Sequence, residues 1–103
     1  MKNSSPGERI AHLEVIYEGD HSQPCVYMAE VVEKAVKKFG ARIRWEKVEL
    51  TKRKGAQRYA ELSVRNGAVA PVPSLFINGK LAFERVPPLR ALKDYLEENF
   101  EMT

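Results

Sequence analysis

Cys25 has the widest chemical repertoire in this chain, because a thiol can act as a nucleophile, a redox group or a metal ligand. It is the single cysteine among 103 residues, which excludes an intramolecular disulfide and a cysteine-rich zinc site. Ser22 lies three residues earlier, and a hydrolytic serine would need a base that is oriented by an acid. His21 is adjacent, but no third partner is identifiable, so Ser22 is better interpreted as a helix cap.

His21 and Cys25 stand one helical turn apart and could in principle ligate a metal ion, with His12 or Asp20 as a further ligand. Protein metal sites usually need three or four ligands, and here only two are suitably spaced. The sequence therefore predicts no metal site and no cofactor. His21 is then an exposed turn residue, and Cys25 is either a small core residue or a redox thiol.

The charge balance is mildly basic, with 17 Lys and Arg residues against 14 Asp and Glu residues and a net charge of +3. The one dense basic run, Lys52-Arg53-Lys54, is extended by Arg58 and Arg65. We expect these side chains to form a solvated loop and helix face, since nucleic-acid binders usually concentrate their charge on one face. Nucleic acid is therefore not the expected partner, and polyanion binding through Lys52–Arg65 is the weaker alternative.

No stretch approaches the ~18 apolar residues that a membrane span requires, so a membrane protein is excluded at this stage. Residues 1–9, MKNSSPGER, lack the apolar core of a secretory signal, and the expected location is cytoplasmic. We expect these nine residues to form a disordered tail and residues 10–103 to form one domain.

Around the Cys25 segment, alternating apolar residues predict a strand over Ile10–Glu18 with both faces partly covered. A helix is expected to begin with Ser22 as N-cap, because Pro24 suits a first helical turn, and to end at Gly40. Apolar residues then recur at three- and four-residue steps along one helix face, at Cys25, Met28, Ala29, Val32, Ala35, Val36 and Phe39.

Strands and helices are also expected to alternate along the rest of the chain. Arg42–Leu50 is expected to be a second strand, whose apolar phase shifts at Val48 and suggests a bulge or an edge strand. Asn78-Gly79 predicts a type I′ hairpin turn. A second helix is expected over Gly55–Arg65, with an apolar face formed by Ala56, Tyr59, Ala60, Leu62 and Ser63. Two further strands are expected over Ser74–Ile77 and Lys80–Val86, and a last helix follows Pro87-Pro88.

The resulting order β-α-β-α-β-β-α predicts an α/β fold with a mixed four-stranded sheet. A right-handed crossover gives a parallel pair of first and second strands, and the hairpin adds an antiparallel pair. We expect the strand order 2-1-3-4, with the first and third helices on one face of the sheet and the second helix on the other.

Two local motifs resemble those of the thioredoxin superfamily. Ser22-Gln23-Pro24-Cys25 follows a strand and opens a helix, and it is similar to the family's Cys-Gly-Pro-Cys redox box with serine in place of the first cysteine. Val72-Pro73-Ser74 resembles the family's Ile-Pro-Thr segment, whose proline is cis and faces the redox box. The resemblance extends over about Leu13 to Phe100 and implies a thioredoxin-like fold.

The departures from the family pattern concern its chemistry. Ser22 stands where the family has its nucleophilic cysteine, and a hydroxyl does not undergo thiol–disulfide exchange. Cys25 matches the resolving cysteine, on a helix face that should be buried. Ile16 replaces the buried acid, and Val86-Pro87-Pro88 replaces the Gly-Gly turn with which glutaredoxins hold glutathione.

The resemblance, with these departures, implies a thioredoxin-like protein that binds an extended peptide or a protein and lacks dithiol activity. Its groove would involve His21, Ser22, Val72 and Pro73. The alternative is an enzyme, a monothiol thiol–disulfide oxidoreductase that uses an exposed Cys25.

Overall fold

β1 (Ala11–Tyr17) is an inner strand of a four-stranded sheet in the order β2-β1-β3-β4. The computed structural model describes residues 10–100, so the tail expected over residues 1–9 lies outside the described residues. β2 (Ile43–Glu49) pairs with β1 in parallel, whereas β3 (Leu75–Ile77) pairs with β1 antiparallel. β4 (Lys80–Phe83) returns antiparallel to β3. The predicted strand order and directions are confirmed.

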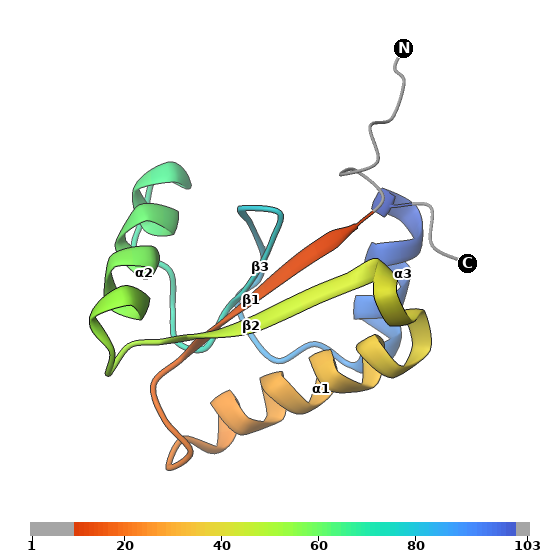
Figure 1. Cartoon of the computed structure of the whole chain (residues 1–103), viewed down its shortest axis with the longest axis horizontal. Helices are drawn as coiled ribbons and strands as arrows, with labels where there is room; N and C mark the ends of the chain where they lie inside the picture. Colours follow the sequence, from red (N-terminus) through yellow and green to blue (C-terminus); the bar gives the residue numbers. More distant parts are fainter. Residues whose placement is uncertain (1–9, 101–103) are drawn as a thin grey trace.

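The helices cover both faces of this sheet, as expected (Figure 1). α1 (Gln23–Phe39) and α3 (Leu89–Phe100) share the larger apolar core with one face of β1 and β3. α2 (Arg53–Arg65) lies on the opposite face, where a smaller core gathers around Ile16, Leu62 and Phe76. A short 3₁₀ turn, η2 (Gly40–Arg42), connects α1 to β2. The arrangement is a thioredoxin-like α/β fold.

The apolar phase shift in the second strand has a different cause from a bulge. The pairing of β1 and β2 runs without interruption from Ala11↔Ile43 to Tyr17↔Glu49. Ile43 and Trp45 pack into the α1 core, whereas Val48 points to the α2 core, because each helix covers a different end of β2. β2 is an edge strand, so that half of the expectation is confirmed, while the irregular pairing occurs between β3 and β4.

α2 begins two residues earlier than expected and presents a different face. Leu62 and Ser63 are buried and Tyr59 is half-buried, but Ala56 and Ala60 are exposed, contrary to the prediction. The cause is a close approach at Gly55, where an added Cβ would lie 1.9 Å from the carbonyl oxygen of Glu49. A helix that contacts β2 through this glycine turns its alanines to solvent.

The hairpin turn has the expected residues in the expected conformation. Asn78 and Gly79 have positive φ angles of 51° and 83°, as a type I′ turn requires. β4 ends at Phe83 rather than Val86, and α3 begins directly after Pro88. Among the helices of residues 10–100, none is long and apolar enough to cross a membrane.

Candidate functional site

Ser22 caps α1. Its backbone is extended (φ −94°, ψ 108°), and its Oγ accepts a hydrogen bond from the backbone N–H of Cys25 at 3.4 Å. Pro24 sits in the first helical turn, where a missing N–H leaves no hydrogen bond unmade. The hydroxyl therefore has a structural role at the position where the resemblance would place a nucleophilic thiol.

Cys25 is fully buried between α1 and β1, as expected from its place on the apolar face of the helix. Its Sγ accepts a hydrogen bond from the backbone N–H of Glu18 at 3.5 Å. The thiol in turn faces the carbonyl oxygen of Ile16, 4.0 Å away. The sulfur therefore has protein on all sides and no direct access to a solvent-borne disulfide.

The loop before β3 meets the same point of β1. The Val72–Pro73 peptide bond is cis, and Pro73 is buried. The carbonyl oxygen of Ser74 accepts a hydrogen bond from the N–H of Ile16 at 2.9 Å. Ile16 thus contacts the Cys25 thiol through its carbonyl oxygen and the proline loop through its N–H, which brings the two motifs together.

Val72 leaves its main chain free at this junction. Neither its N–H nor its carbonyl oxygen has a hydrogen-bond partner among residues 10–100. Its half-buried side chain packs against both apolar cores. An unpaired main-chain donor and acceptor in a half-buried loop is the feature to which an extended peptide can add as a strand.

His21 lies at the rim of this region rather than in it. Its side chain is exposed, lies against Gly19 and approaches the carboxylate of Glu18 at 3.8 Å. Cys25 is buried against β1, so the two potential metal ligands are not brought together. Within residues 10–100, the group of His, Cys, Asp and Glu side chains that is close enough to hold an ion includes neither of them.

Tyr17, at the end of β1, is buried and donates a hydrogen bond from its hydroxyl to the carboxylate of Asp20 at 2.5 Å. This hydrogen bond, together with burial and the charge of Asp20, raises the pKa of Tyr17 to about 12. The contact closes the turn that leads from β1 to the Ser22 cap. The face of the ring packs under Lys47, whose Nζ lies 4.3 Å from the ring centroid.

A second polar cluster lies on the α2 face of the sheet, and the sequence analysis missed it. Glu14 is only 2% exposed, and its carboxylate accepts two hydrogen bonds from Arg58, at 2.7 Å from Nε and 2.9 Å from Nη2. The contact with Glu14 raises the pKa of the Arg58 guanidinium above its ordinary value. The expectation that Arg58 belongs to a solvated face is wrong, because this arginine pairs with a buried carboxylate. The available signal was a glutamate in the middle of an apolar strand.

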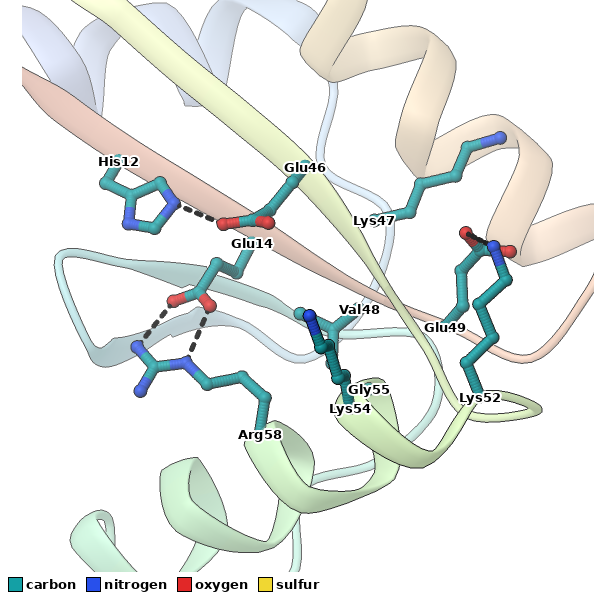
Figure 2. A pocket seen from close by; sticks show the side chains of 10 residues that line it. All are labelled: His12, Glu14, Glu46, Lys47, Val48, Glu49, Lys52, Lys54, Gly55 and Arg58. Carbon is teal, nitrogen blue, oxygen red and sulfur yellow. Dashed lines mark hydrogen bonds and ion pairs between the residues drawn. The ribbon is translucent and has the colours of Figure 1, made fainter.

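A pocket of about 350 Å³ opens between β2 and α2 beside this ion pair. Figure 2 shows His12, Glu14 and Glu46 side by side on the two strands, with Arg58 reaching them from α2. The Nε2 atom of His12 lies 2.8 Å from a carboxylate oxygen of Glu46. Lys54 lines the same pocket from the first turn of α2.

Comparison with known proteins bears on the fold. No protein-family model and no curated protein matches the chain. A solved structure described as that of a malarial protein is similar, with a TM-score of 0.63 and 15% sequence identity. The match covers 87% of this chain and 97% of that one. At such identity the likeness concerns the fold alone.

The fold thus brings some of the predicted site residues together and leaves others apart. Cys25 and the loop of Val72 and Pro73 meet at Ile16, at one end of β1, and Ser22 is hydrogen-bonded to Cys25. His21 stands outside this group, in the turn before α1. The polar cluster around Glu14 lies on the other face of the sheet and forms a separate candidate site.

Proposed function

We propose that this chain is a thioredoxin-like module that binds an extended peptide or a protein segment and that lacks dithiol–disulfide exchange. The observation that carries the proposal is the main chain of Val72, which has no hydrogen-bond partner among residues 10–100 and belongs to the loop that meets Ile16, the residue that Cys25 also faces. A peptide strand pairing with Val72 would form main-chain hydrogen bonds without any need for a reactive thiol.

The loss of dithiol chemistry is supported by two features of the box. Ser22 provides a hydroxyl in place of the attacking thiol, and that hydroxyl is engaged with the N–H of Cys25. Cys25 cannot form a disulfide within the chain because no second cysteine exists. Monothiol chemistry, the alternative, would require the Cys25 sulfur to reach an external disulfide, and full burial disfavours this.

Side-chain recognition in the groove would depend on exposed residues around Val72 and the start of α1. Tyr27 follows Cys25 by two residues and is 52% exposed. An aromatic ring of this kind provides a broad contact at low entropic cost. We place this function in the cytosol, where a lone cysteine stays reduced.

The test is a selection of extended peptides from a display library, followed by affinity measurement with fluorescent copies of the selected peptide. The substitution Val72→Pro removes the main-chain N–H next to Pro73 and should weaken binding about tenfold, the equivalent of one hydrogen bond. Val64→Ala, on the exposed side of α2, is the matched control and should leave the affinity unchanged. Failure to select any peptide, or equal affinity of the wild-type chain and folded Val72→Pro, would contradict the proposal.

A further inference from the structure

We propose that His12, Glu14 and Glu46 form a binding site for a divalent ion of the zinc type on the α2 face of the sheet. This site is independent of the peptide groove. It also departs from the expectation of no metal site, which considered His21 and Cys25 as the leading ligands.

The pairing of β1 and β2 creates the ligand set. Glu14 and Glu46 are direct partners in the parallel pairing, and His12 precedes Glu14 by two residues, on the same face. One ligand atom from each of the three side chains lies within 4.8 Å of the other two. Imidazole nitrogen with two carboxylate oxygens is a donor set that zinc accepts, with a fourth position left for water.

The pocket is lined by three carboxylates and by the cations of Lys47, Lys52, Lys54 and Arg58, and the two carboxylates of the cluster lie on paired strands. Like charges directly opposite each other on neighbouring strands repel, and Glu14 is almost fully buried. Arg58 neutralises Glu14, whereas Glu46 forms its ion pair within residues 10–100 with the imidazole of His12. A divalent ion between Glu46 and His12 would compensate this second carboxylate.

Arg58 would remain in place when the ion binds. It uses one lone pair on each oxygen of Glu14, so that each oxygen keeps another lone pair for the ion. Carboxylate ligands in metal sites are commonly oriented by such an outer hydrogen bond. We therefore assign Arg58 as a positioning residue that fixes the direction of the Glu14 carboxylate.

His12 is held firmly enough to act as a ligand. Its backbone N–H donates to the side-chain oxygen of Asn78 at 2.6 Å, and its carbonyl oxygen accepts from the N–H of Asn78 at 2.9 Å. The ring then reaches the pocket from a fixed strand position (Figure 2). The 350 Å³ pocket provides an entry path and room for a water molecule on the ion.

The experiment is calorimetric titration of the untagged chain with Zn²⁺, paired with visible absorption spectra of the Co²⁺ complex. We expect saturable binding of one ion per chain. The substitutions His12→Ala and Glu46→Gln should each weaken binding at least ~10-fold, as loss of even an outer-shell partner does. His21→Ala removes the other histidine of the chain and is the matched control, with unchanged affinity expected.

Glu46→Gln keeps the size of an exposed side chain, so this variant should fold even if His12→Ala does not. Absence of saturable Zn²⁺ binding to the wild-type chain would overturn the proposal. Equal affinity of the wild-type chain and Glu46→Gln would do the same, as would a loss of binding in His21→Ala that matches the loss in His12→Ala. None of these results depends on whether a peptide binds near Val72.

Discussion

At the scale of single residues, the hydroxyl of Ser22 separates this chain from a dithiol box. The substitution Ser22→Cys would place a second thiol at the N-terminus of α1, where the helix dipole and the first-turn N–H groups stabilise a thiolate. We predict that this variant forms an intramolecular disulfide with Cys25 and gains insulin-reduction activity in the presence of dithiothreitol. The rate should stay modest, because Ile16 supplies no buried acid or base.

Ser22→Ala is the control for this prediction, since it removes the hydroxyl without adding a thiol and should stay inactive. It should also lose ~1 kcal/mol of unfolding free energy with the helix cap. Wild-type activity comparable to that of Ser22→Cys would instead favour a monothiol enzyme. A variant that does not oxidise would show that the alignment with the redox box is wrong.

The ion pair of Glu14 and Arg58 gives a second prediction at this scale. Arg58→Ala would leave a nearly buried carboxylate without its cation, which should lower the free energy of unfolding by about 2–4 kcal/mol. This range lies below that for a fully buried pair, because Arg58 itself is 31% exposed. Urea denaturation measures the effect, with Arg53→Ala at the exposed start of α2 as control. A loss no larger than that of the control would mean that Glu14 does not depend on Arg58.

The contact between Tyr17 and Asp20 predicts a late tyrosine titration. The pKa of Tyr17 is about 12 in the folded chain, above the ordinary value of 10.0, so the neutral form is the one that folding favours. The stability gained from this contact should be complete below pH ~10 and lost as the pH rises to ~12. Absorbance at the tyrosinate band should show one late-titrating group that Tyr17→Phe removes and that Tyr27→Phe, at an exposed tyrosine, retains. Titration of all tyrosines together near pH 10 would argue against the contact.

At the scale of elements, Gly55 determines how closely α2 approaches β2. Gly→Ala inside an exposed helix normally stabilises by about 1 kcal/mol. Here the new Cβ would lie 1.9 Å from the carbonyl oxygen of Glu49, so Gly55→Ala should destabilise the fold and displace α2. Ala60→Gly on the exposed side of the same helix should cost only the ordinary ~1 kcal/mol. A stabilised Gly55→Ala variant in chemical denaturation would refute the close contact.

The same elements show where sequence patterns suffice and where they do not. Capping by Ser22, the apolar face of α1 and the turn at Asn78 are local features, and each was predictable because neighbouring residues determine it. The face of α2 depends instead on Gly55 meeting a strand, and the apolar phase of β2 depends on which helix covers each end. These are tertiary contacts, which periodicity in one segment does not contain.

At the scale of the whole molecule, topology was predictable and the second site was not. The order of elements and the hairpin were enough to derive the β2-β1-β3-β4 sheet. The Ser22 and Val72 motifs were recognisable because each is contiguous in sequence. His12, Glu14, Glu46 and Arg58 come from three separate elements, and only the pairing of β1 with β2 and the packing of α2 bring them together.

The two candidate sites thus differ in which face of the sheet carries them. The face covered by α1 and α3 buries Cys25, and Val72 packs against the cores on both faces. The face covered by α2 carries the ion pair and the pocket. Substitutions in one site should therefore leave the other unchanged, because within residues 10–100 no hydrogen bond or ion pair joins Ser22 or Cys25 to the Glu14 cluster.

The measurement that most directly tests the central claim is a map of backbone amide chemical shifts during titration with a selected peptide. The account predicts that the largest changes occur at the amide of Val72 and at those of His21 and Ser22, because a strand added at Val72 pairs with its main chain and lies beside the α1 N-terminus. Amides on the α2 face, such as that of Lys54, should stay nearly unchanged. Changes concentrated on the α2 face, with an unaffected Val72 amide, would contradict the proposed peptide groove.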